Sequence, residues 1–199
     1  PVKKAGYHFS AARNDLGGGV AHYTFDVHMG SGPYDMVRIH RVIKERRPYR
    51  PFRTRGEVFM VHGAIQDFDD IFLTAGALVV DESTSAPYYM AAHGIDVWGI
   101  DLAWNRVPID PPEGFEFMKD WGVEKDIDHV MRSLAIARLI RVFSCQGFSK
   151  LNLLGFSYGV DIAYGAAGRE TQTHKVCRHI KGLVPVDSQM KSDDPDAMQ

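Results

Sequence analysis

A serine lies midway between two glycines at residues 155–159, where the sequence reads Gly-Phe-Ser-Tyr-Gly. An apolar run at 151–154 precedes these residues, and a run of small residues at 160–167 follows them. This pattern predicts a strand, a sharp turn and a helix. Small residues two positions before and after the serine let the strand and the helix pass close together. Ser157 is therefore predicted at the tip of a strained turn, where a helix begins.

Two roles are open for Ser157. The first N–H groups of the following helix point toward the group that the serine would attack, which favours a developing oxyanion and makes Ser157 a candidate nucleophile. A serine in this position can instead cap the helix with its side chain. The setting between a buried strand and a helix favours the nucleophile.

The apolar patterns elsewhere predict the fold class. Two alternating runs, 20–28 and 34–44, flank a Gly/Pro turn and predict an antiparallel hairpin with one face toward solvent. Continuous apolar runs predict strands buried on both faces, at residues 57–61, 95–102, 151–154 and 181–187. Helices are predicted at residues 67–93, 126–142 and 160–167. The chain is therefore predicted to be α/β, a mostly parallel sheet with helices on both faces and an N-terminal antiparallel hairpin.

The 199 residues predict one domain with two flanking segments. Residues 1–19 are polar and end in three glycines, so we expect an irregular N-terminal arm. Residues 20–187 are predicted to be the N-terminal portion of the domain. Residues 188–199 are polar, and we expect a disordered tail that leads to a lid or to a cleavage site.

Charge and composition exclude some classes of partner. The net charge is −2 and the pI is about 6.5, so neither nucleic acid nor an anionic membrane is a predicted partner. No apolar run approaches the roughly 20 residues of a membrane span. The two cysteines, Cys145 and Cys177, either form one bridge or stay reduced, and the compartment is left open.

No pattern of metal or cofactor ligands is evident in the sequence. His174, Cys177 and His179 are close together, but their helical and strand-edge context does not suit a metal centre. The other histidines are scattered and are read as core, surface or loop-holding residues: His8, His22, His28, His40, His62, His93 and His129. No glycine-rich phosphate loop is present, so neither a metal nor a cofactor is predicted.

Three motifs follow predicted strands and so fall at one edge of the sheet, at His62-Gly63, at residues 101–106 and at the serine turn. With these motifs the chain resembles the α/β-hydrolase family, and residues 58–101 are similar to its acid-lipase-like members. The resemblance implies that Ser157 is the nucleophile, on a turn that Gly155 and Gly159 permit.

The resemblance also implies an oxyanion hole. The backbone N–H of Tyr158 would contribute one donor, and the N–H of Ala64 or Ile65 would contribute the other. His62 and Gly63 begin the loop that carries the second donor, and the resemblance gives His62 the role of holding that loop by hydrogen bonds.

A triad in this family runs in the order serine, acid, histidine. Asp187 ends the last predicted strand and is the candidate acid, although some members place the acid one strand later, which would lie beyond residue 199. Asp187 could then be a strand-end carboxylate that bonds the following turn. His174 and His179 precede that strand, at the opposite edge of the sheet, so neither is expected to be the base.

The predicted fold is incomplete within these residues. Six strands are predicted where the family usually has eight, and a strand of buried type at an edge is an aggregation hazard. We therefore expect the remaining strands, any lid and the catalytic histidine to come from a further C-terminal segment or from a second polypeptide.

The predicted function is a serine hydrolase that cleaves a carboxylic ester, with a lipid-like ester among the candidate substrates, through an acyl-enzyme on Ser157. Two alternatives stay open: acyl transfer to another acceptor on the same site, and a non-catalytic subunit or binding module that keeps the serine turn. Four aromatic residues either line an apolar substrate pocket or pack a loop on the core: Trp104, Phe115, Phe117 and Trp121.

Overall fold

The structure, a computed structural model, describes residues 10–74 and 81–188. Eight strands form one sheet. They are β1 (Ser10–Asp15), β2 (Val20–His28), β3 (Met36–Arg47), β4 (Arg50–Pro51), β5 (Gly56–Val61), β6 (Ile95–Asp101), β7 (Leu151–Phe156) and β8 (Ile180–Val186). The α-helices are α1 (Ala86–Ala92), α2 (Val123–Phe143) and α3 (Tyr158–Thr171). A π-helical turn spans Asp69–Leu73, and 3₁₀ turns span Glu82–Thr84, Ala103–Arg106, Glu116–Met118 and Lys175–Cys177.

The strand order is β1-β2-β3-β6-β5-β7-β8, and β4 pairs with β3 outside this path. The strands β6, β5, β7 and β8 are parallel, whereas β1, β2, β3 and β6 pair antiparallel in that order. The α/β class and the N-terminal hairpin are thus confirmed in a mixed sheet. The carboxyl ends of the parallel strands meet at one edge, where ligands bind in sheets of this kind.

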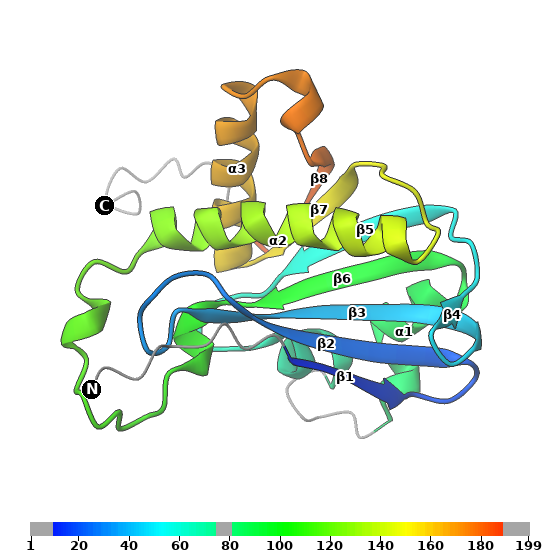
Figure 1. The fold of residues 1–199 in the computed structure, drawn as a ribbon, viewed down its shortest axis with the longest axis horizontal. Coiled ribbons are helices and arrows are strands. Elements are labelled where there is room, and N and C mark those ends of the chain that lie inside the picture. Colours follow the sequence, from blue (N-terminus) through cyan, green and yellow to red (C-terminus); the bar gives the residue numbers. More distant parts are fainter. Residues whose placement is uncertain (1–9, 75–80, 189–199) are drawn as a thin grey trace.

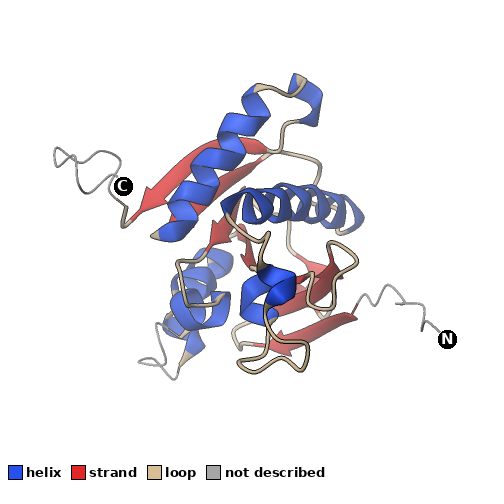
Figure 2. Ribbon diagram, turned by 90° about the vertical axis from the view of Figure 1, so that its left-hand side faces the viewer, coloured by secondary structure: helices blue, strands red, loops and turns tan. Residues whose placement is uncertain are grey.

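Helices cover both faces of the sheet (Figures 1 and 2). α2 and α3 pack against each other on one face, over a core that includes Phe59, Trp98 and Leu153. α1 lies on the opposite face with the π-helical turn, over a second core that includes Phe68 and Val97. Burial on both faces explains why the central strands read as continuous apolar runs.

Two predictions about local structure were wrong. Residues 10–15 form β1 rather than an irregular arm, because the glycines at 17–19 all have positive φ and reverse the chain so that β1 pairs with β2. Within 67–93, the described residues are helical only in short pieces at 69–73, 82–84 and 86–92. The predicted arm at 1–9, the predicted helix at 75–80 and the predicted disordered tail at 189–199 lie outside the described residues.

Among the residues that the structure describes, β8 is the last strand of the sheet. Its side chains Val184 and Val186 are 42% and 39% exposed, as on a strand without a neighbour. Cys145 and Cys177 are exposed and not bridged. In the same part of the chain, no helix combines the length and the apolarity that a membrane span requires.

Candidate active site

Ser157 lies between the end of β7 and the start of α3 with φ 50° and ψ −122°, a backbone conformation that costs a non-glycine residue about 1–3 kcal/mol. Its N–H donates to the carbonyl oxygen of Val186 at 3.0 Å. Its side chain makes no capping hydrogen bond to the helix. The geometry therefore does not support the capping role, and the hydroxyl is available for other chemistry.

Both glycines of the serine turn are required, because a side chain at either position would clash with backbone atoms. A Cβ on Gly155 would run into the carbonyl group of Gly159, and a Cβ on Gly159 would lie 2.7 Å from the carbonyl oxygen of His62. Strand β7, the turn and the end of β5 therefore approach as closely as backbones can. This proximity places Ser157 beside the loop that follows β5.

His62 begins that loop and is fully buried. The N–H of Leu102 donates to its Nε2 at 3.2 Å, so Nε2 is an acceptor and the ring proton sits on Nδ1, which donates to the carbonyl oxygen of Gly63 at 2.7 Å. Burial lowers the pKa of His62 and keeps the ring neutral. Both nitrogens are occupied in holding the loop, so His62 cannot act as a base.

Ala64 and Ile65 follow at the tip of the loop. Ile65 has a positive φ of 57° and a side chain that is 93% exposed, which is unusual for a β-branched residue. Within the described residues, the backbone N–H groups of Ala64, Ile65 and Tyr158 donate to no protein acceptor. These are the three groups that the resemblance assigns to an oxyanion hole.

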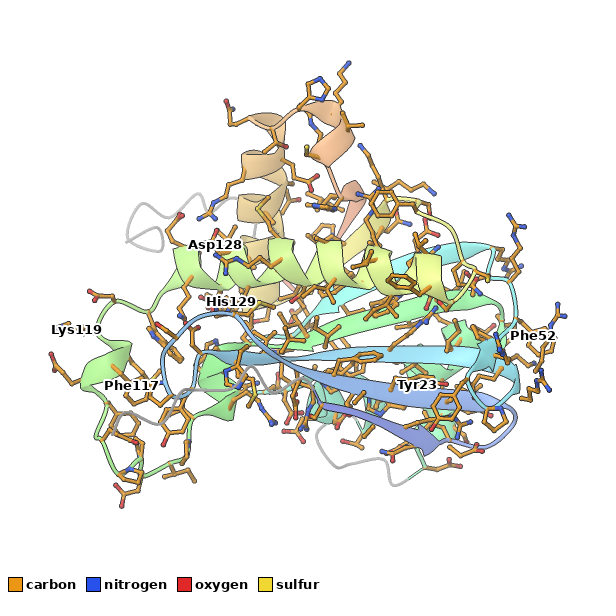
Figure 3. The ribbon with its side chains drawn as sticks, viewed as in Figure 1. Tyr23, Phe52, Phe117, Lys119, Asp128 and His129 are labelled. Atoms are coloured by element: carbon orange, nitrogen blue, oxygen red, sulfur yellow. The ribbon has the colours of Figure 1, made fainter. Side chains whose placement is uncertain are left out.

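A pocket of about 370 Å³ opens beside these donors. It is lined by Ala64, Ile65, Trp104, Met118, Trp121, Gly122, Asp126 and Tyr158. Trp104 and Trp121, two of the four aromatic residues considered as pocket residues from the sequence, thus line a largely apolar cavity. Phe117 instead packs on Tyr34 and Trp121, in the loop that projects beyond the start of α2 (Figure 3), and Phe115 is exposed.

Asp126 is a pocket residue that the sequence reasoning missed. It is 5% exposed, and the hydroxyl of Tyr158 donates to its Oδ2 at 2.9 Å. Burial raises the pKa of Asp126 to about 6, and burial together with this carboxylate raises the pKa of Tyr158. From the sequence, Asp126 is one of the acids expected in the first turn of a helix, and no local signal distinguishes it from them.

Asp187 directly follows β8 and is exposed, with a φ of 55°. Because the carbonyl oxygen of the preceding residue, Val186, accepts from the N–H of Ser157, this end of β8 lies at the serine turn. The carboxylate of Asp187 forms no hydrogen bond with the described residues. The predicted acid and the predicted nucleophile are thus carried by neighbouring strand ends.

No histidine bonds the Ser157 hydroxyl in the part of the chain that the structure describes. His179 lies at the amino end of β8, 2.9 Å from Nη1 of Arg138, and His174 caps the neighbouring 3₁₀ turn. Both precede β8, whereas Ser157 follows β7. Because β7 and β8 are parallel, the two histidines lie at the opposite edge of the sheet from Ser157.

No protein-family model matches this chain, and no curated protein does. Among solved structures, the chain is similar to a "putative lipase" from Sulfolobus solfataricus, with a TM-score of 0.67 and 18% identity over 91% of this chain and 49% of that one. It is also similar to an acetyl xylan esterase from Paenibacillus sp. R4, with a TM-score of 0.51 and 13% identity over 92% of this chain and 55% of that one. The chain spans about half of the length of these structures. The sheet order, the serine turn and these similarities together identify the fold as that of an α/β-hydrolase.

Proposed function

We propose that this chain carries the nucleophile of a serine hydrolase that cleaves carboxylic esters through an acyl-enzyme on Ser157. The observation that carries the proposal is the position of Ser157. Its hydroxyl is not used to cap α3, and its turn lies beside backbone N–H groups that have no acceptor among the described residues.

In the proposed reaction, Oγ of Ser157 attacks the ester carbonyl carbon and passes its proton to a general base. The N–H groups of Tyr158 and of Ala64 or Ile65 stabilise the oxyanion of the tetrahedral intermediate. The C–O bond to the alcohol then breaks, and the alcohol leaves with the proton from the base. Water, deprotonated by the same base, attacks the acyl-enzyme, and the acid leaves as Ser157 recovers its proton.

The base is proposed to be a histidine outside these 199 residues, in a further C-terminal segment or in a second polypeptide. Two facts support this assignment. No described histidine bonds the hydroxyl of Ser157, and the chain spans only about half of the length of the structures it resembles. Asp187 is the proposed acid that would orient this histidine. A serine that lacks its base loses most of its activation.

The proposed substrate is an ester with an apolar acyl or alcohol group. The indole rings of Trp104 and Trp121 and the side chain of Met118 give the pocket apolar walls. Its volume of about 370 Å³ suits a small or short-chain ester. The names of the two similar structures, a lipase and an esterase, agree with ester chemistry.

The test is covalent labelling of the native protein, with every polypeptide that accompanies it, by a fluorophosphonate followed by intact-mass analysis. We expect one adduct, on Ser157, which is lost in Ser157→Ala and kept in Ser10→Ala, a variant of an exposed serine in β1. A complete, folded protein without this adduct would favour a non-catalytic subunit. An added alcohol that diverts the product from acid to a new ester would favour acyl transfer.

A further inference from the structure

Two buried histidines and one carboxylate converge on the face of the sheet that α1 covers. Nε2 of His22 lies 2.9 Å from Nδ1 of His40. Oδ1 of Asp69 lies 3.6 Å from Nδ1 of His40 and 3.9 Å from Nε2 of His22. Within the described residues, no other group of three or more histidine, cysteine or acidic side chains brings its ligand atoms together in this way.

The positions of the two histidines follow from strand pairing. In the antiparallel register of β2 and β3, Thr24 pairs with His40 and Val42 pairs with His22, so the histidines are diagonal neighbours on one face. Asp69 comes from a different element, the first turn of the π-helical segment after the loop of His62. The cluster therefore joins three segments that are distant in sequence.

Of the three ligand atoms that face one another, one is buried without a hydrogen-bond partner. Oδ1 of Asp69 is inaccessible to solvent and accepts no hydrogen bond, although the side chain as a whole is 49% exposed. A buried carboxylate oxygen that accepts nothing is costly, since it has lost water and gained no donor in exchange. A ligand that supplies positive charge at this point would remove the cost.

We propose that His22, His40 and Asp69 bind one zinc ion. Donor atoms about 2.0–2.2 Å from zinc at tetrahedral angles lie about 3.3–3.5 Å from one another. The observed separations of 2.9, 3.6 and 3.9 Å bracket these values, so adjustments of a few tenths of an ångström bring the three donors to coordinating positions. A water molecule from the exposed side of Asp69 would complete the coordination.

The donor set selects the ion. Two imidazole nitrogens and one carboxylate oxygen suit zinc, whereas magnesium and calcium prefer oxygen ligands alone. His22 is 4% exposed, and burial favours the neutral imidazole, which is the form that coordinates a metal.

The residues around His40 hold it as a ligand. Oδ1 of Asp101 lies 3.0 Å from Nε2 of His40, the nitrogen that faces away from the proposed ion. A carboxylate on the far nitrogen is the usual outer partner of a metal-binding histidine, because it fixes the proton there and leaves the other nitrogen free. The ring of Phe68 stacks on His40 with a centroid distance of 4.4 Å. The same Asp101 oxygen accepts from the N–H of Phe68 at 2.9 Å, which ties this segment to β6.

The alternative without an ion is a hydrogen bond in which Nε2 of His22 donates to Nδ1 of His40. That arrangement accounts for the 2.9 Å contact but leaves Oδ1 of Asp69 without a donor. In the proposed zinc site, the ring proton of His22 moves from its Nε2 to its own Nδ1. Nε2 of His22, Nδ1 of His40 and Oδ1 of Asp69 then all coordinate the ion. The ion would then anchor the segment that follows the loop of Ala64 and Ile65 to strands β2 and β3.

The test is metal binding by the purified protein after a chelator has removed bound ions. We expect one equivalent of Zn²⁺ per chain by calorimetry, the visible absorption of tetrahedral cobalt when Co²⁺ replaces it, and a higher Tm with zinc. Asp69→Asn and His22→Gln are expected to remove the cobalt absorption and to weaken zinc binding more than about tenfold. Asp101→Asn is expected to weaken it by about 10–100-fold.

Matched controls separate coordination from general effects. Asp70→Asn makes the same change at the adjacent, exposed carboxylate, and His93→Gln changes an exposed histidine; both should bind zinc as the wild type does. Circular dichroism establishes whether each variant is folded. If His22→Gln does not fold, the comparison of Asp69→Asn with Asp70→Asn tests the proposal, because the side chain of Asp69 is half-exposed. The proposal would be overturned if the folded wild type took up neither Zn²⁺ nor Co²⁺. It would also be overturned if Asp69→Asn and Asp70→Asn bound zinc equally, or if the site preferred Mg²⁺ or Ca²⁺.

Discussion

A methyl group on Gly63 would lie 3.2 Å from Cβ of Ser157 and 3.3 Å from Cδ1 of Phe156. The loop after β5 thus touches the serine turn directly, although the two are far apart in the chain. The absence of a side chain at Gly63 sets how closely the proposed oxyanion donors approach the proposed nucleophile.

Gly63→Ala should therefore displace the loop by a few tenths of an ångström relative to Ser157. We expect the rate of fluorophosphonate labelling to fall about tenfold, because catalysis is sensitive to small errors in position, while Tm changes little. Gly168→Ala is the control, since a Cβ on this helical glycine meets nothing within 4 Å. An unchanged rate in Gly63→Ala would mean that the loop does not contribute to the reaction.

Asp187→Asn tests the proposed acid in the complete enzyme. If Asp187 orients the histidine, kcat for ester cleavage should fall by about 10³–10⁴-fold with little change in KM, because the wrong tautomer of the base is favoured. Asp110→Asn, in an exposed loop, is the matched control. Wild-type kcat in Asp187→Asn would move the acid to a strand beyond residue 199.

Asp126 should make stability depend on pH. Its pKa is raised from 3.8 to about 6 in the folded protein, mainly by burial, so the folded state holds this proton more tightly than the unfolded state does. The stabilisation is complete below the unfolded pKa and is lost as pH rises through about 6. Asp126→Asn should therefore gain stability relative to wild type between about pH 4 and about pH 7.

Urea unfolding of both proteins across this pH range measures the effect. The side-chain amide introduced by Asp126→Asn would still accept from the hydroxyl of Tyr158, so the pocket hydrogen bond is kept. Asp161→Asn makes the same change at an exposed position in the first turn of α3 and serves as the control. Parallel curves for wild type and the Asp126 variant would show that the carboxyl group titrates alike in both states.

A buried ion network should dominate the electrostatic contribution to stability. Asp96 is fully buried and accepts from Arg41 at 2.8 and 2.9 Å and from Arg141 at 2.6 Å. Asp96→Asn would leave two buried guanidinium groups with less compensation, and we expect the free energy of unfolding to fall by about 3–5 kcal/mol.

Asp128→Asn is the matched comparison, because Asp128 pairs with Arg169 on the exposed side of α2 (Figure 3). Exposed ion pairs contribute at most about 1 kcal/mol, so this variant should unfold close to wild type in urea. Similar losses from the two substitutions would contradict the dominant role of the buried network.

Much of the fold follows from local pattern. The serine turn could be predicted because a strand that passes directly into a helix needs glycine at 155 and 159. Both glycines lie within two residues of Ser157, so the pattern is visible in the local sequence. The central strands could be placed because burial on both faces requires continuous apolar runs. β1 could not, since its residues are mostly exposed and polar, and its conformation comes from pairing with β2.

The sites depend on how distant segments meet. Alternation in β2 and β3 places His22 and His40 on a face, but it does not say that the register makes them neighbours or that Asp69 folds onto them. In the sequence, Asp126 is indistinguishable from other acids in the first turn of a helix. Its burial results from the packing of α2 beside Tyr158, whose hydroxyl bonds its carboxylate. Local sequence specifies conformation and periodicity over a few residues, whereas burial and the approach of charged groups arise only when the sheet and its covering helices are assembled.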